Sequence, residues 1–299
     1  MKFNGKKVEI TPYKVITLIV LTIYSISMLV VLLWGVNTAL KAQSEFRVNR
    51  VGFPKGWPWE WEWSNLIYVF SNFEVLVNTE TVANKVIDFW SMLFYTVWYA
   101  LGGAVIITMV TCIMAYMTTY FKYRLSNVIT AIVVVTMILP IVGAYPSEIQ
   151  ILKTLGLYNT LYGMWIQKAH FLGMYFLVFQ ATFQSVSKEY SEAAYIDGAS
   201  ELQILVRIML PIVRNTIFTV ILLYFVAFWN DYQTPLMYFP NYPTLAYGLQ
   251  FVSQYGTNKM STVPMRLSGA IVILLPILTI FLIFRNRILG NVTMGGVKE

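Results

Sequence analysis

Apolar stretches alternate with polar segments along the whole chain of 299 residues. A helix needs about 20 predominantly apolar residues to cross the hydrocarbon core of a bilayer. The apolar stretch 92–119 is the longest, and a helix of that length tilts in the bilayer or extends into water. The pattern predicts an all-α polytopic membrane protein with about six transmembrane helices. We expect these helices over residues 15–36, 92–119, 125–145, 162–183, 217–237 and 267–284.

The first apolar stretch follows a basic N-terminal segment, which is also a property of secretory signal peptides. The basic residues are Lys2, Lys6, Lys7 and Lys14. The apolar stretch 15–36 is longer than the core of a signal peptide, and no small-x-small cleavage pair follows at the right distance. We therefore expect it to be retained as the first transmembrane helix.

Composition supports the membrane class. Hydrophobic residues make up 58% of the chain and charged residues 12%, which is about half the charged share of a soluble domain. The formal net charge is +7. In this setting the positive charge indicates basic loops beside anionic membrane lipid rather than a nucleic-acid partner.

The distribution of basic residues predicts the orientation. If the N-terminus is cytoplasmic, twelve of the 21 Lys and Arg residues fall in cytoplasmic segments. Five of the other nine lie in the long loop 37–91, where charge constrains topology less, so the short loops compare twelve with four. We therefore expect both termini to face the cytoplasm of a bacterial cell.

The sequence lacks the residues of several kinds of site. A single cysteine (Cys112) and a single histidine (His170) exclude an internal disulfide, a multi-cysteine metal site and a two-histidine metal site. No Walker-type phosphate loop occurs. We therefore predict no catalytic residue, no metal and no cofactor in this chain.

Ionisable residues are also scarce within the predicted spans. Asp231 is the only acidic residue there, and Lys168 and His170 lie near the outer end of the fourth span. An ion-coupled carrier uses buried acids or a proton relay. Their scarcity favours an energy supply from a separate protein over an ion-coupled secondary carrier.

The cytoplasmic loop 187–213 has the pattern of a helix, a sharp turn and a second helix. Ser187 can cap the first helix, and Gly198 can end it in a left-handed conformation. Pro211 marks the return to the bilayer. The apolar residues of the second helix are spaced to lie on the membrane: Leu202, Leu205, Ile208 and Met209. From these features alone, a partner-docking segment and an ordinary amphipathic connector are both open.

A resemblance decides between them. The loop resembles the EAA motif of permeases of ATP-binding-cassette importers, in which this loop docks on the ATPase as a coupling helix. The resemblance implies a type I importer permease fold and ATPase-coupling roles for the matching residues. These are Glu192, Ala193, Ala194, Asp197, Gly198, Ala199, Leu210 and Pro211.

The resemblance extends to most of the chain and to the carbohydrate permeases in particular. The segment 227–249 is similar to the fifth span and following loop of carbohydrate permeases. The segment 43–57 is similar to the first loop of the second permease of maltose-type systems. The tail with Gly295, Gly296 and Lys298 is similar to the end of the same permease, which in that group reaches the ATPase. The group carries an Asn-Ser pair near the start of the second span, where this chain has Tyr95 and Thr96. This departure puts any local role of that Asn in doubt.

Two aromatic segments each have two alternative roles. Trp229, Asn230 and Tyr232 combine a ring face with amide and hydroxyl groups, which suits a sugar. The alternative is helix packing together with anchoring by aromatic residues at the membrane interface. The tryptophans at 57, 59, 61 and 63 form either an interfacial aromatic belt with an external cap or a sugar-stacking surface.

The resemblance implies a permease subunit of a binding-protein-dependent carbohydrate importer. Its partners would be a second, different permease, two ATPase subunits that bind ATP and Mg, and an extracytoplasmic sugar-binding protein. We expect an N-terminal segment 1–90, a core permease domain 91–290 with the coupling loop 187–213, and a cytoplasmic tail 291–299. A non-sugar cargo such as glycerol phosphate is the alternative within the same class.

Overall fold

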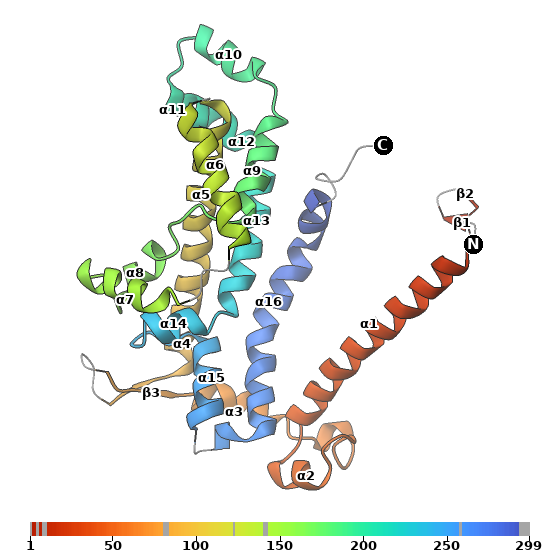
Figure 1. Ribbon diagram of the computed structural model, residues 1–299. Helices are drawn as coiled ribbons and strands as arrows, with labels where there is room; N and C mark the ends of the chain where they lie inside the picture. Colours follow the sequence, from red (N-terminus) through yellow and green to blue (C-terminus); the bar gives the residue numbers. More distant parts are fainter. Residues whose placement is uncertain are drawn as a thin grey trace. The chain divides into compact units, whose positions relative to one another are not determined.

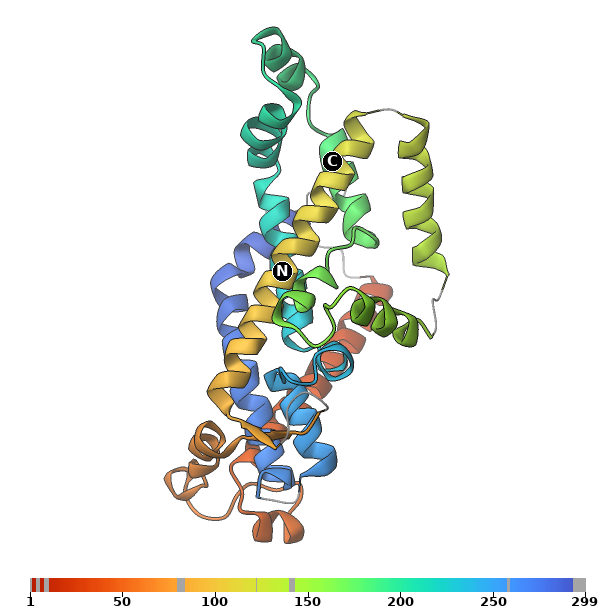
Figure 2. The same cartoon turned by 90° about the vertical axis from the view of Figure 1, so that its left-hand side faces the viewer.

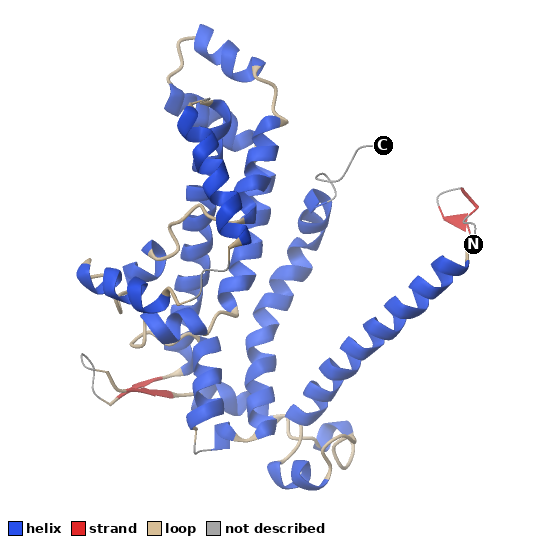
Figure 3. Ribbon diagram, viewed as in Figure 1, coloured by secondary structure: helices blue, strands red, loops and turns tan. Residues whose placement is uncertain are grey.

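The computed structural model describes residues 2–3, 6–7, 11–79, 84–121, 123–139, 143–256 and 259–292. These residues are mostly helical, with two short hairpins (Figure 3). The chain divides into two units, Met1–Asn72 with Val252–Val272, and Phe73–Phe251 with Ile273–Glu299. Each unit is described by itself.

The first unit contains a long apolar helix and a folded polar segment. Helix α1 (Pro12–Ala39) starts with a proline in its first turn, where the missing N–H leaves no bond unmade. It is followed by α2 (Gln43–Val48), η1 (Pro58–Glu60) and α3 (Ser64–Asn72), and the start of α16 (Val263–Val292) completes the unit. Strands β1 (Lys2–Phe3) and β2 (Lys6–Lys7) pair antiparallel, and η4 (Lys259–Ser261) precedes α16.

A buried lysine organises the segment after α1. The Lys41 ammonium donates to the carbonyl oxygens of Asn49, at 3.0 Å, and of Gly52. The Asn65 amide donates to the carbonyls of Ala39 and Lys41 at 2.9 and 3.0 Å. Because buried polar groups need partners, these bonds fix the loop between α1 and α3.

The tryptophan-rich segment lies on the surface of this unit. The rings of Trp57 and Trp59 are stacked with centroids 5.3 Å apart, and their residues are 65% and 73% exposed. The Trp63 indole N–H donates to the Pro58 carbonyl at 2.7 Å. The two interpretations of this aromatic surface therefore both stay open.

The second unit is built around one continuous helix. It runs over Phe89–Tyr120 and comprises α4 (Phe89–Val97), a π-helical turn η2 (Trp98–Gly102) and α5 (Gly103–Tyr120). Helices α9 (Met174–Gln184) and α13 (Arg214–Trp229) pack against α5. Their shared core is apolar and includes Cys112, Ala115, Phe179 and Phe183, all buried. Helix α6 (Arg124–Ile138) runs back beside α5 (Figure 2).

Shorter elements close the two ends of these helices. Strands β3 (Val75–Val77) and β4 (Lys85–Ile87) pair antiparallel with Val75 opposite Ile87. One end carries α7 (Tyr145–Thr154), α8 (Leu161–Ile166), α14 (Gln233–Tyr238) and α15 (Leu245–Tyr255). The other end carries α10 (Glu189–Ile196), α11 (Glu201–Ile204), the π-helical η3 (Leu205–Met209) and α12 (Leu210–Ile212) (Figure 1).

The prediction of an all-α membrane protein with several apolar spans is confirmed. Within the described residues, three helices are long and apolar enough to cross a membrane: Pro12–Ala39, Phe89–Tyr120 and Val263–Phe284. The bent pair Glu201–Ile212 and Arg214–Trp229 would make a fourth, and α6 is a shorter apolar helix of 15 residues.

The predicted fourth span, 162–183, is not one helix. It is split into α8 and α9 by the segment 167–173. Gly173 has φ +129°, which an α-helix cannot accommodate, and Lys168 turns into a polar contact described below. The predicted fifth span, 217–237, is likewise split into α13 and α14 around Asp231, because the Asp231 carboxylate accepts the Thr234 N–H at the start of α14.

Candidate functional site

The helix α10 ends in a specific turn that explains three residues of the motif. The Ala199 N–H donates to the Ala194 carbonyl at 2.9 Å, and the Gly198 N–H to the Tyr195 carbonyl at 3.0 Å. Gly198 has φ +77°. This is a Schellman turn, which needs a residue that tolerates the left-handed conformation. The predicted end of the helix at Gly198 is therefore confirmed.

The chain continues from this turn into a second capped helix. Ser200 and Gln203 form a capping box: the Gln203 N–H donates to Ser200 Oγ at 3.4 Å, and the Ser200 N–H to Gln203 Oε1 at 2.8 Å. Helix α11 leads through η3 into α12, and α13 follows after a bend of 73°. Pro211 lies in α12, directly after the π-helical stretch. A proline cannot donate to the preceding turn and its ring crowds that turn, which a widened π-turn relieves.

Part of this bent segment is anchored in the protein core. Ile204, Leu205 and Met209 are buried and belong to one cluster with Phe183 of α9 and Tyr116 of α5. The expectation that Leu205 and Met209 lie on the membrane is wrong, because these side chains complete the core between helices. Protein cores are closely packed, so a displacement of this segment moves the helices beneath it.

Ala194, Ala199 and Gly198 of the motif have different surroundings. Ala194 is buried and Ala199 is packed against the same core cluster. A Cβ added at Gly198 would meet no atom within 4 Å, so only its backbone conformation restricts the position. Leu210 also packs against the cluster, whereas Pro211 is exposed. A small residue therefore suits the packing at 194, whereas 198 requires a residue that tolerates the left-handed conformation.

The outer face of α10 is free of packing. Glu192, Ala193 and Asp197 are exposed, and so is Ile196, which is 88% exposed. A hydrogen bond to the Glu201 carboxylate raises the pKa of the Tyr195 hydroxyl to about 12 and links α10 to α11 across the turn. Sequence reasoning missed Ile196, although an apolar residue directly before a glycine turn on an exposed helix was a usable signal.

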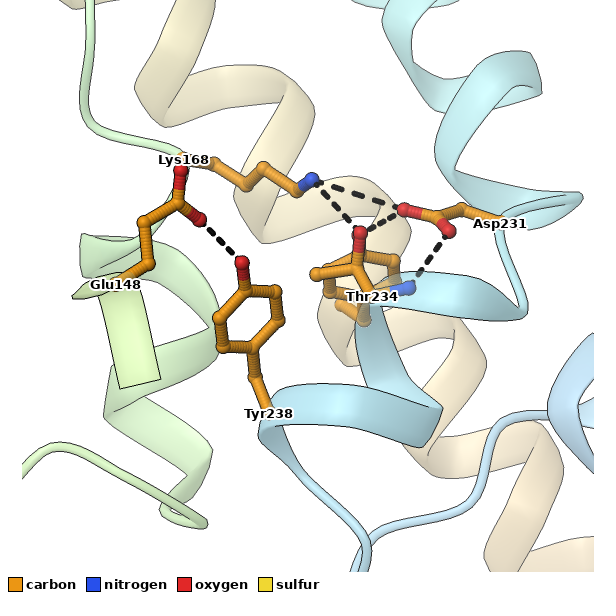
Figure 4. A network of polar contacts seen from close by, with 6 residues as sticks. Glu148, Lys168, Asp231, Thr234 and Tyr238 are labelled. Atoms are coloured by element: carbon orange, nitrogen blue, oxygen red, sulfur yellow. Dashed lines mark hydrogen bonds and ion pairs between the residues drawn. The ribbon is translucent and has the colours of Figure 1, made fainter. Parts of the chain in front are cut away.

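The opposite end of the same helices holds a network of polar contacts (Figure 4). The Lys168 ammonium lies 3.6 Å from Asp231 Oδ2 and donates to Thr234 Oγ1 at 3.4 Å. The Tyr99 hydroxyl donates to Asp231 Oδ2 at 2.6 Å, and the Thr234 N–H to Asp231 Oδ1 at 3.0 Å. Asp231 therefore joins the end of α13, the start of α14 and the π-turn η2. The contacts of Asp231 with Lys168 and Tyr99 were not predicted from the sequence.

Further contacts surround this polar network at the same end of the helices. Lys168 Nζ lies 4.8 Å from the ring centre of Phe228, within cation–π range. The rings of Trp98 and Trp165 stack with centroids 4.1 Å apart, and the Trp165 indole N–H donates to the Trp98 carbonyl at 2.8 Å. The Tyr238 hydroxyl donates to the Glu148 carboxylate (Figure 4). These charged and aromatic side chains therefore find their partners within the second unit.

The residues predicted for a substrate path are placed differently from one another. Trp229 is 2% exposed, and its indole N–H donates to the Ile273 carbonyl of α16 at 3.1 Å. This favours the packing alternative for Trp229. Asn230 and Tyr232 are exposed, and the Asn230 amide donates to the Val226 carbonyl at 2.8 Å. No group of three metal-ligating side chains occurs among the described residues.

Two other predictions concern the second span and the tail. Thr96 donates to the Met92 carbonyl at 2.7 Å and accepts the Leu245 N–H at 2.8 Å, so it ties α4 to α15. Tyr95 packs edge-on against Tyr242. The predicted ATPase-contacting tail residues Gly295, Gly296 and Lys298 lie outside the described residues.

Comparisons with known proteins agree with each other. Residues 81–290 match the model of the family described as "binding-protein-dependent transport system inner membrane component". The arabinooligosaccharides transport permease AraQ of Halalkalibacterium halodurans is 25% identical over 244 residues, which cover 81% of each chain. The maltodextrin transport permease MdxG of Bacillus subtilis is 27% identical, over 68% of this chain and 76% of that one.

A solved structure supports the fold. A bacterial ABC transporter involved in the import of the polysaccharide alginate contains a chain that aligns with a TM-score of 0.71. The alignment covers 94% of this chain and 99% of that chain, at 18% sequence identity. The two chains therefore share their fold.

Proposed function

The chain belongs to the family of binding-protein-dependent transport system inner membrane components, and from this premise we propose that its cargo is an oligosaccharide. Membership makes it a multi-pass inner-membrane permease of an ABC transporter complex and implies no catalytic activity of its own. The cargo proposal is supported by the relatives, since AraQ and MdxG are named for the transport of arabinooligosaccharides and maltodextrin.

One observation carries the proposed mechanism. The exposed face of α10 leads into a segment whose Ile204, Leu205 and Met209 side chains are buried in one cluster with residues of α5 and α9. A short helix with small, acidic and apolar side chains suits a groove on a partner. We infer that Glu192, Ala193, Asp197 and Ile196 contact an ATPase subunit, and that α11, η3 and α12 pass its movement to α13.

The partners follow from this arrangement. A second, different permease would supply the other half of the translocation path. Two ATPase subunits would bind ATP and Mg and close on each other, and an extracytoplasmic sugar-binding protein would deliver the cargo. Residues 91–290 would form the core permease domain, and Gly295, Gly296 and Lys298 would add a tail contact to the ATPase.

The orientation follows from charge and from the proposed docking. Both termini and α10 would face the cytoplasm, since the short loops on that side hold most of the basic residues. The Lys168–Asp231 network would then lie at the extracytoplasmic end. Among the predicted path residues, Asn230 and Tyr232 remain candidates for cargo contact because they are exposed at that end.

Reconstituted transport tests the proposal. The complete transporter, with both permeases and the ATPase, is placed in proteoliposomes with its binding protein, and uptake of labelled oligosaccharides is measured with and without internal ATP. We expect ATP-dependent uptake that also requires the binding protein. Uptake driven by an ion gradient without ATP would indicate a secondary carrier. ATP-driven uptake of glycerol phosphate but of no oligosaccharide would overturn the cargo.

A further inference from the structure

A cavity of about 630 Å³ lies where the C-terminal ends of α5 and α9 meet the N-terminal end of α6. Figure 2 shows these ends on the same side as α10. The described residues of the lining include two cations, Arg124 and Lys188, and the amides of Asn127 and Gln184. Neither the family match nor the coupling motif gives this cavity a role.

The charges of the lining are of one sign. Arg124 and Lys188 are exposed, and no carboxylate is among the lining residues that the structure describes. Neither side chain makes a hydrogen bond or ion pair with another residue in the part of the chain that the structure describes. The cavity therefore presents two uncompensated positive charges and suits an anion.

The start of α6 adds to this preference. Its first turn holds no acidic residue, and its N-cap residue Tyr123 makes no capping hydrogen bond. The Ser126 hydroxyl is committed to the Phe121 carbonyl at 2.6 Å. The first amides of a helix and its dipole favour an anion, and here no side chain of the helix itself fills that place.

An apolar surface begins beside the cavity. Leu125, Val128 and Ile132 are exposed, Leu125 to 65%, and their spacing places them along one face of α6. A soluble anion makes no use of such a face. A phospholipid uses both features, since its headgroup is an anion and its acyl chains are apolar.

We propose that this cavity binds the phosphate headgroup of an anionic phospholipid, with the acyl chains along Leu125, Val128 and Ile132. Assignment of the lipid to the cytoplasmic leaflet rests on the proposed function. Lys188 directly precedes α10, so the bound lipid contacts the segment that leads into the docking helix.

The test compares two double variants of this chain within the purified complete transporter. In Arg124→Gln with Lys188→Gln, the cavity loses both charges. In the control, Arg207→Gln with Arg214→Gln, the same net charge is removed from two exposed residues that do not line the cavity. Native mass spectrometry measures the binding of added phosphatidylglycerol and of phosphatidylcholine.

We expect phosphatidylglycerol to bind about thirtyfold more weakly to the cavity variant than to the wild type. Each basic residue near anionic lipid contributes about 1 kcal/mol to binding, and a loss of roughly 1.4 kcal/mol weakens binding tenfold. The control should bind it as the wild type does, and phosphatidylcholine should bind weakly to all three. Equal binding of phosphatidylglycerol to both double variants would overturn the proposal.

Two further arms identify the occupant. If inorganic phosphate or glycerol 3-phosphate displaces phosphatidylglycerol at similar concentration, the site is a soluble-anion site and the lipid assignment is wrong. If the cavity variant loses the ATPase while keeping phosphatidylglycerol, the occupant is an acidic surface of the ATPase. Failure of ATP-dependent uptake by the wild type would overturn the proposed function but leave the lipid measurement interpretable.

Discussion

The two ends of the helices α5, α9 and α13 are closed in different ways. Each end has a helix that stops in a Schellman turn, at Gly198 after α10 and at Gly156 after α7. At the α7 end, the charges of Lys168 and Asp231 are paired within the unit. At the α10 end, the acidic and apolar side chains on the outer face have no such neighbours among the described residues.

This difference separates stability from function. Contacts satisfied within one unit stabilise the fold, whereas exposed apolar and charged groups on a rigid base are available to another protein. Matched substitutions at the two ends should therefore change different measurements. The expected effects below run from the largest to the smallest.

The largest effect should follow loss of the buried carboxylate. Asp231→Asn leaves Lys168, which is largely buried, without its counter-charge. Removing one partner of a buried pair costs about 3 kcal/mol or more. We expect a clear fall in melting temperature of the purified complex, with the ATPase still bound below that temperature.

The double variant is the control for this change. Lys168→Met combined with Asp231→Asn removes both charges, so no uncompensated charge stays buried. We expect it to recover much of the lost stability. A single variant as stable as the wild type would show that the pair is solvated.

The second effect compares the two Schellman glycines. Gly198→Val forces a β-branched residue into the left-handed region, at a cost of roughly 2 kcal/mol or about thirtyfold in the population of the native turn. Space is not the reason, since a Cβ added at either glycine would meet no atom within 4 Å. We expect Gly198→Val to reduce ATP-dependent uptake and ATPase binding.

Gly156→Val is the matched variant, with φ +67° against +77°. It should lower thermal stability by a similar amount but leave ATPase binding intact. If both variants lose the ATPase equally, the turn after α10 has no special part in docking.

The third effect concerns exposed apolar side chains. Ile196→Ser should weaken ATPase binding about tenfold, because burial of an isoleucine side chain contributes roughly 1.5 kcal/mol or more. Leu155, which is 63% exposed next to the other turn, is the control. Leu155→Ser should leave ATPase affinity, measured by titration of the purified ATPase, unchanged. Equal affinities of all three proteins would remove Ile196 from the interface.

The smallest effect should come from the helix caps. Ser200 caps α11, and Thr160 caps α8 by accepting the Gly163 N–H at 3.0 Å. Either residue changed to Ala should cost about 1 kcal/mol locally. Hydrogen exchange should speed up at the start of the affected helix in both variants, while uptake should fall only for Ser200→Ala. A fall in uptake for Thr160→Ala alone would reverse the assignment of the two ends.

The sequence predicted local features at the α10 end well. Gly198 acts through its own backbone neighbours, so its residue type sufficed to place the end of α10. The cap of α11 by Ser200 was not predicted. Family resemblance was still needed to choose docking over a membrane-surface connector. The buried positions of Leu205 and Met209 were mispredicted, since apolar spacing does not distinguish lipid from a protein core.

The α7 end was hard to predict for a physical reason. Lys168 and Asp231 are 63 positions apart in the sequence, and no residue next to either of them indicates that the two form an ion pair. The break of the apolar stretch 162–183 depends on the same contact. Hydropathy did not predict this break, because an apolar span tolerates a single charge such as that of Lys168. The π-turn η2 likewise contains residues whose partners are distant in sequence, since Tyr99 bonds to Asp231 and Trp98 to Trp165.

The burial of Cys112 has a practical consequence for spectroscopy. It is the only thiol of the sequence and is fully buried among α5 and α9, where water-soluble alkylating reagents do not reach it. A cysteine introduced at the exposed Ile196 or Tyr232 would then carry a spin or fluorescent label alone. One label at each end in turn would report when each end moves during a cycle of ATP hydrolysis, without prior removal of the native thiol.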